Sequence, residues 1–198
     1  MHTQTHVIMG AALFGRGIPK RAWIAALGGL VPDLAMLLTV AVLKLLAIPD
    51  PIIFGFLYWQ EPWQVANAIG HSFLLWGGLF LLALVMRERL SASASAIDRW
   101  SLVMVFAGSA LLHSAIDFLL HREDAHMSFW PLSRWKFVSP VSYWDRAYYG
   151  QYASLFEAAL GLLLAALLIR RFANRWVRAA LVAAMLLYVA VPAYFILT

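Results

Sequence analysis

The hydrophobic residues of this chain fall into long blocks that short polar connectors separate. Five blocks are about as long as the roughly 20 residues that a helix needs to cross a bilayer. They are residues 22–47, 63–86, 100–122, 151–169 and 177–197. The pattern therefore predicts an all-α fold, a polytopic membrane helical bundle of about five main spanning helices. Residues 1–198 are expected to form a single integral-membrane domain.

Prolines and a short first block modify this picture. Residues 4–15 are apolar but too short to span, which predicts an N-terminal re-entrant or interfacial helix. A proline inside a helix removes a backbone donor and bends or breaks the helix. We therefore expect two helical pieces that meet near Pro32, and a kink at Pro192. Residues 48–62 and 122–150 are rich in proline and aromatic residues and are predicted to be loops.

The composition supports a membrane protein. The chain is 63% hydrophobic and only 13% charged, and its mean hydropathy is +0.77, whereas a soluble domain carries more charge. The basic residues flank the apolar blocks, so the net charge of +5 does not indicate nucleic-acid binding; the expected partner is the lipid bilayer. The absence of cysteine excludes disulfides and thiolate metal sites. The N-terminus lacks the basic start of a cleavable signal peptide.

Lysine and arginine positions predict the orientation. Residues 16–21, the polar connector 87–99 and residues 170–178 are basic and are assigned to the cytoplasm. The connector at 48–62 has no basic residue, and loop 122–150 mixes basic with acidic residues. This loop and the C-terminus are therefore expected outside.

One block carries a stripe of ionisable residues. His113, Asp117 and His121 are spaced four apart, so in a helix they share one face. Ionisable residues inside a membrane are costly and usually face protein or water. We therefore expect this stripe to belong to a functional site.

Other blocks carry polar residues at a similar depth. Counted at 1.5 Å per helical residue from the nearest basic anchor, four of these residues lie at roughly 18 to 24 Å. They are Asp33, His71, His113 and Glu157. His6 reaches ~15 Å if its short helix re-enters the membrane, and Asp117 reaches ~27 Å. The sequence therefore predicts one polar layer made by several helices.

Imidazole and carboxylate together suit zinc, and less selectively manganese or iron. The candidate metal ligands are His6, Asp33, His71, His113, Asp117 and Glu157. A bound dication would balance carboxylates in a low dielectric and activate a water for attack on a phosphoester, such as a phospholipid headgroup. A second metal nearby would suit the same reaction. Glu157 or Asp117 would act as general base where metal does not engage it fully.

Each of these residues also has a simpler explanation. His113 and Asp117 could form a structural hydrogen-bonded pair, and His71 lies in a patch of small residues that could hold helices together. Asp33, which follows Pro32, could cap a helix. Glu157 has no nearby cation in the sequence and so has the weakest structural explanation.

Residues in loops and at helix ends have simpler explanations than metal binding. Three histidines, His2, His121 and His126, are expected to be solvated. The aromatic residues of loop 122–150 predict an interfacial belt; they are Trp130, Trp135, Tyr143, Trp144, Tyr148 and Tyr149. Arg134, Lys136 and Arg146 could bind a substrate phosphate or face anionic lipid.

A series of short motifs carries a family resemblance. They are THVIMGAAL, LGGLVPDLAML, GHSFLLWGGL, LLHSAIDFLLH, and PLSRWKFVSPVSYWDRAYYG running into LFEAAL. With them the chain resembles a bacterial inner-membrane family of metal-dependent hydrolases, distantly related to the zinc-dependent phospholipase C and P1 nuclease superfamily. The resemblance implies phosphoester hydrolysis in the bacterial inner (cytoplasmic) membrane. It implies metal-site roles for His6, Asp33, His71, His113 and Asp117, with Glu157 as a further candidate.

The chain departs from the pattern of that family in two places. Ala66 and Asn67 stand where the family has a His-Arg pair, and Gly70 replaces a threonine. Tyr148 and Tyr149 stand where relatives often have histidine. Fewer histidines imply a site with fewer metals, or one without catalytic competence.

Two other function classes fit the same residues. The buried carboxylates and histidines could form the proton or ion path of a small transporter or channel subunit. Alternatively, the polar layer could only hold the helices of a structural membrane protein together. Metal dependence separates the hydrolase from both.

Overall fold

The computed structural model describes residues 1–90 and 94–197, and this part of the chain is helical with no strand. The helices are α1 (Thr3–Phe14), α2 (Pro19–Leu45), α3 (Asp50–Gly55), α4 (Glu61–Gly70), α5 (Phe73–Arg89), α6 (Ala94–Leu120), α7 (Gly150–Arg171) and α8 (Arg175–Leu197), with short 3-10 turns η1 (Leu57–Trp59) and η2 (Arg146–Tyr148). The predicted all-α fold is confirmed.

Five helical segments are long and apolar enough to cross a membrane, by length and composition. They are Pro19–Leu45, Glu61–Arg89, Asp98–Leu120, Gly150–Arg171 and Arg175–Ala193. They match the five predicted blocks. Residues 91–93 of the predicted polar connector lie outside the described residues.

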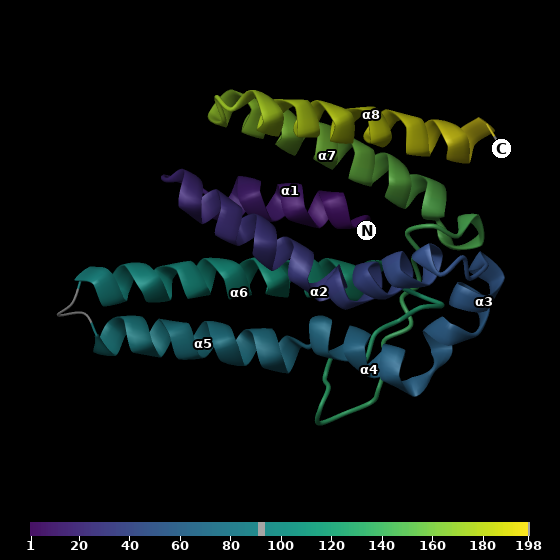
Figure 1. Cartoon of the computed structure of the whole chain (residues 1–198), viewed down its shortest axis with the longest axis horizontal. Helices are drawn as coiled ribbons and strands as arrows, with labels where there is room; N and C mark the ends of the chain where they lie inside the picture. The colour runs from purple at the N-terminus through teal and green to yellow at the C-terminus, as the bar shows by residue number, and fades with distance from the viewer. Residues whose placement is uncertain (91–93, 198) are drawn as a thin grey trace.

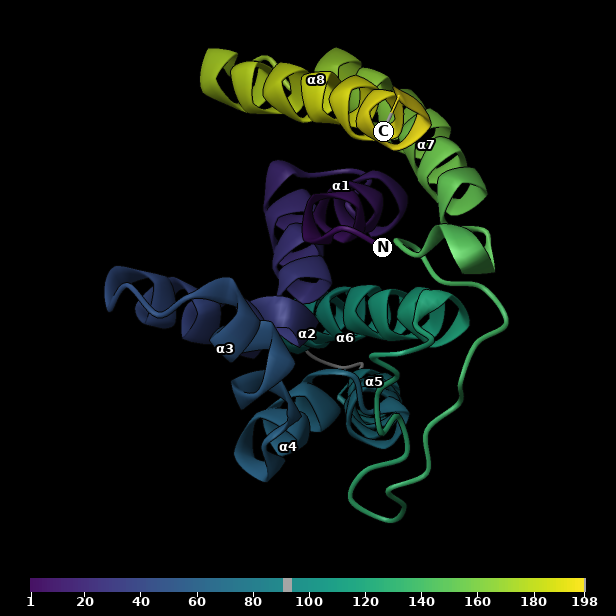
Figure 2. The same cartoon turned by 90° about the vertical axis from the view of Figure 1, so that its right-hand side faces the viewer.

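The helices pack as three layers around α2. The α7–α8 pair forms one layer, α1 and α2 form the next, and α5 with α6 forms the third (Figure 1). Turned by 90°, the molecule shows α1 between α2 and the α7–α8 pair (Figure 2). The C-terminal ends of α1, α5 and α7 lie at the same end of the bundle (Figure 1), which gathers the basic connectors there.

The predicted break of the helix near Pro32 is wrong. Pro32 lies inside one continuous helix, α2, which packs against α1 and α6 on either side, so one missing hydrogen bond does not break it. The break occurs instead in the block predicted as residues 63–86, between α4 and α5. There the hydroxyl of Ser72 accepts a hydrogen bond from the Leu75 N–H and caps α5. The predicted loop 48–62 also contains α3 and η1.

Two glycines allow the close helix contacts that position polar residues. A Cβ on Gly29 of α2 would overlap the carbonyl of His6 in α1, and a Cβ on Gly70 of α4 would overlap the carbonyl of Pro32 in α2. Without side chains at these positions, the three backbones approach closely. The contacts bring α1 and the α4–α5 break against the part of α2 that carries Asp33.

Candidate metal centre

Four buried side chains from three parts of the chain converge on one point. Asp33 comes from α2, His71 from the break between α4 and α5, and His113 and Asp117 from α6. Their exposed fractions are 6%, 2%, 1% and 1%, respectively. One ligand atom from each lies within 4.8 Å of the other three, so this four-residue group could hold a metal ion. Asp33 is inside α2, which excludes the helix-capping explanation for it.

The distances in the four-residue group suit a small ion. The Nε2 atom of His113 lies 3.1 Å from Asp117 Oδ2 and 3.5 Å from Asp33 Oδ1. The Nε2 atom of His71 lies 3.4 Å and 3.6 Å from the same two oxygens. Ligands about 2.0–2.1 Å from a tetrahedral zinc are roughly 3.3–3.4 Å apart. The four nitrogen–oxygen distances are therefore compatible with two histidines and two carboxylates around one zinc ion.

Both histidines are held with Nε2 toward the centre. The Nδ1–H of His71 donates to the carbonyl oxygen of Asn67 at 2.9 Å, and that of His113 donates to Gly29 O at 2.8 Å. A donor at Nδ1 leaves a lone pair on Nε2 of the neutral ring. In the described part of the chain, neither Nε2 atom has a hydrogen-bond partner. A backbone carbonyl on one nitrogen and a free second nitrogen are typical of metal-binding histidines.

Two residues of α1, and Met1 just before it, contact the two carboxylates. The hydroxyl of Thr3 donates to Oδ2 of Asp33, the oxygen that points away from the histidines. The Oδ1 atom of Asp117 lies 2.9 Å from His6 Nε2 and 2.8 Å from the α-amino nitrogen of Met1. His6 therefore contacts the far oxygen of Asp117 and lies beside the four-residue group.

A second group of potential ligands shares Asp117. Ligand atoms of Asp117, His121 and His126 also lie within 4.8 Å of one another. His121 Nε2 is 3.5 Å from Asp117 Oδ2, and its Nδ1 is 3.0 Å from an oxygen of Asp124. The ring of His126 stacks on that of His71 with centroids 3.8 Å apart. The two groups are therefore contiguous.

The expectation that His121 is solvated is wrong, because its side chain is buried with 7% of the residue exposed. The spacing of four residues, which puts His121 on the same helix face as His113 and Asp117, was the sequence signal for its place in the site. Burial lowers the pKa of His121, but Asp117 and Asp124 raise it more, to about 9. The surroundings therefore favour a positive charge at this position, which a proton or a bound cation can supply.

Glu157 lies apart from both groups. Its carboxylate accepts hydrogen bonds from the backbone N–H of His2 at 2.8 Å and from the hydroxyl of Thr5. Thr5 in turn accepts from the hydroxyl of Tyr188 at 2.8 Å. Glu157 thus joins α1 to α7 and α8, and its predicted roles as metal ligand and general base stay predictions.

A cavity of about 570 Å³ lies beside the four-residue group. Asp33, His71, His121 and His126 contribute to its wall, as do aromatic residues of the connectors, Tyr58, Trp59, Tyr143 and Trp144. Tyr143 and Trp144 were predicted as interfacial residues, and here they line the cavity. Burial, together with the charge of Asp124, raises the pKa of Tyr58 and of Tyr143 above the usual range. Both phenols therefore stay protonated and can donate hydrogen bonds into the cavity.

The three predicted phosphate-binding cations do not line this cavity in the described residues. Arg134 forms an exposed ion pair with Glu61 at 2.7 Å, and the Lys136 ammonium donates to Gln64 Oε1 at 2.7 Å. Arg146 is exposed in η2. Their predicted contact with substrate stays a prediction.

Comparison of the chain with protein-family models, with curated proteins and with solved structures gave no match. The resemblance to bacterial inner-membrane hydrolases therefore stays a prediction.

Proposed function

We propose that this chain is a membrane-embedded, zinc-dependent hydrolase of the bacterial inner membrane that cleaves a phosphoester, with a phospholipid as its substrate. One observation carries the proposal. Two imidazole nitrogens without hydrogen-bond partners and two carboxylate oxygens meet at the wall of a cavity lined by aromatic residues. Buried polar atoms are normally paired, and a bound cation would pair these.

Zinc is the proposed metal because the donor set contains two nitrogens and two oxygens, with nitrogen–oxygen distances of 3.1–3.6 Å that suit zinc ligands. Manganese and iron accept the same donors with less selectivity. The ion would supply a Lewis acid for the phosphoryl oxygen and would lower the pKa of a water toward neutrality. Asp33, His71, His113 and Asp117 would hold it.

The remaining cavity residues have separate proposed roles. Tyr58 and Tyr143, both protonated, would donate hydrogen bonds to the phosphoryl oxygens. His121 faces the cavity and is oriented by Asp124 through its Nδ1 atom. In the proposed reaction it would exchange a proton with the leaving group through Nε2. If a second ion is bound, Asp117, His121 and His126 would hold it instead.

Metal content and activity test this proposal together. The wild-type protein, purified in mild detergent, should contain zinc and hydrolyse a chromogenic phosphodiester and phospholipid vesicles. His113→Ala should lose the zinc and at least about 100-fold in rate, since even changes to residues that merely orient a ligand cost 10- to 100-fold. His2→Ala is the matched control for zinc content, because this histidine contacts Glu157 outside both ligand groups. Wild-type protein without metal, or hydrolysis that survives His113→Ala, would refute the proposal; proton-coupled flux without metal would favour a transporter.

A further inference from the structure

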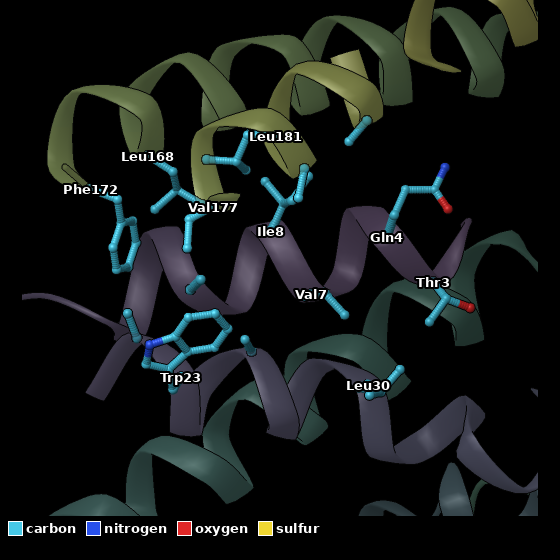
Figure 3. Close-up of a pocket in the computed structure, with 15 residues that line it drawn as sticks. Thr3, Gln4, Val7, Ile8, Trp23, Leu30, Leu168, Phe172, Val177 and Leu181 are labelled. Carbon is cyan, nitrogen blue, oxygen red and sulfur yellow. The ribbon is translucent and has the colours of Figure 1, made fainter. Parts of the chain in front are cut away.

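A second cavity, of about 420 Å³, lies between α1, α2 and the α7–α8 pair (Figure 3). Its wall is almost entirely apolar, with Val7, Ile8, Leu30 and Leu181 among the lining side chains. Thr3 and Gln4 lie at one end, and Trp23 and Phe172 lie at the other (Figure 3). We call it the α1–α8 groove.

The α1–α8 groove is open to the surface of the membrane-crossing helices. Trp23 of α2 is 56% exposed, and Ala180 of α8 is also exposed, yet both line the groove. The α1 residues of its wall run from Thr3 to Ala11, which is about 12 Å of helix. Acyl chains surround these helices in a bilayer, so a chain can enter the groove from the side.

Two arginines are fixed at the Phe172 end of the groove. The guanidinium of Arg171 donates to the carbonyl oxygen of Ala11 at 3.2 Å, and Arg178 Nε donates to Phe172 O at 2.7 Å. Ala11 and Phe172 both line the groove. Both arginine residues are exposed, and within the described residues neither forms an ion pair with a carboxylate. The groove is therefore apolar along its length and positively charged at one end.

We propose that the α1–α8 groove binds an anionic phospholipid, with one acyl chain in the groove and the phosphate against Arg171 and Arg178. The charge pattern selects this occupant, because each arginine near a membrane surface attracts anionic lipid and the groove adds apolar contact for the chain. No acidic side chain lines the groove in the described part of the chain, so nothing there opposes the headgroup charge. This lipid is distinct from the proposed substrate, whose phosphoester would lie in the cavity beside Asp33 and His71.

The bound lipid would connect the α7–α8 pair to the rest of the bundle. The groove wall includes residues of α1 and α2 on one side and of α7 and α8 on the other. An acyl chain there would contact all four helices. The lipid should therefore stabilise the folded protein whether or not the metal centre is occupied.

Native mass spectrometry of the full chain tests the proposal. Protein would be reconstituted in bilayers of phosphatidylglycerol mixed with phosphatidylcholine, and the retained lipid would be identified. Wild type should retain phosphatidylglycerol over phosphatidylcholine by roughly 10- to 30-fold, as expected for two arginines. Replacing both Arg171 and Arg178 by Gln should abolish this preference.

A pair of substitutions on α8 separates the groove from ordinary lipid contact. Ala180→Trp places an indole in the groove and should reduce phosphatidylglycerol retention at least about tenfold. Ala183→Trp is the control, because Ala183 is exposed on the same helix but does not line the groove. The proposal would be overturned if the two variants retain equal amounts of phosphatidylglycerol, or if wild type retains the two lipids equally. It would also be overturned if Ala180→Trp disrupts a dimer of this chain and leaves lipid retention unchanged. The zinc content should be unchanged in all of these variants. The result for the groove can therefore be told apart from the result for the proposed hydrolase.

Discussion

The close contact of Gly70 with α2 gives a sharp test of how the proposed metal centre is assembled. An alanine Cβ at this position would lie far inside contact distance of the Pro32 carbonyl, whereas ordinary contacts begin near 3.4 Å. Because the obstacle is backbone, it cannot rotate away, and α4 must move from α2 by roughly 1 Å. His71, the next residue, would move away from Asp33. Gly70→Ala should therefore lower metal affinity and activity by about 100-fold, the cost of a 1 Å misplacement in a catalytic site.

Gly77→Ala provides the matched control for this substitution. Gly77 lies inside α5, and an added Cβ there meets no heavy atom within 4 Å. Alanine should be neutral or should stabilise the helix by up to about 1 kcal/mol. Zinc affinity would be measured by competition with a chelating dye, and folding by thermal melting of the metal-free proteins. If Gly70→Ala binds zinc as tightly as Gly77→Ala does, the proposed assembly through this contact is refuted.

Further predictions follow from single contacts. Thr3→Val removes the hydrogen bond to Asp33 and should weaken zinc binding by about 10- to 100-fold in the same dye competition, whereas an unchanged affinity would exclude this role. Ser72→Ala removes the α5 cap and should lower the free energy of unfolding by about 0.5–2 kcal/mol in denaturant titrations. Glu157→Gln should reduce thermal stability but leave the zinc content unchanged, and a loss of zinc would place Glu157 in the centre. Zinc should dissociate as the pH is lowered, because protons compete for the histidine nitrogens, and binding that is independent of pH would contradict imidazole ligands.

The number and position of the long apolar helices could be predicted, because they depend on the lengths of the hydrophobic blocks in the sequence. A run of about 20 apolar residues has few alternatives to a membrane-crossing helix. Helix continuity was harder to predict. Pro32 is a strong local signal, but packing on both sides of α2 outweighs one missing hydrogen bond. The break at His71 and Ser72 has no proline and depends on tertiary contacts such as the hydrogen bond from the Ser72 hydroxyl to Trp130 O.

The candidate site was partly predictable because depth along a helix follows from residue counts. Asp33, His71, His113 and Asp117 were placed near one layer from the 1.5 Å rise, and the structure brings them together. Depth does not give the direction in which a side chain points. Glu157 shares the predicted layer but faces His2 and Thr5.

Residues in loops could not be placed from sequence. His126 belongs to no periodic element, and its position depends on the path of the chain after α6. Its ring stacks on that of His71, which is 55 positions earlier in the chain. The same holds for Tyr143 and Trp144, whose aromatic character fits an interfacial belt as well as it fits a cavity wall.

Zinc-edge X-ray absorption of the purified protein tests the central claim, that these four residues form a metal centre, most directly. The account predicts about one tightly bound zinc with nitrogen and oxygen ligands at about 2.0–2.1 Å, of which two are imidazoles. Two imidazoles correspond to His71 and His113, and the chain has no cysteine to supply sulfur. A protein that binds no zinc under these conditions, or zinc without imidazole ligands, would contradict it.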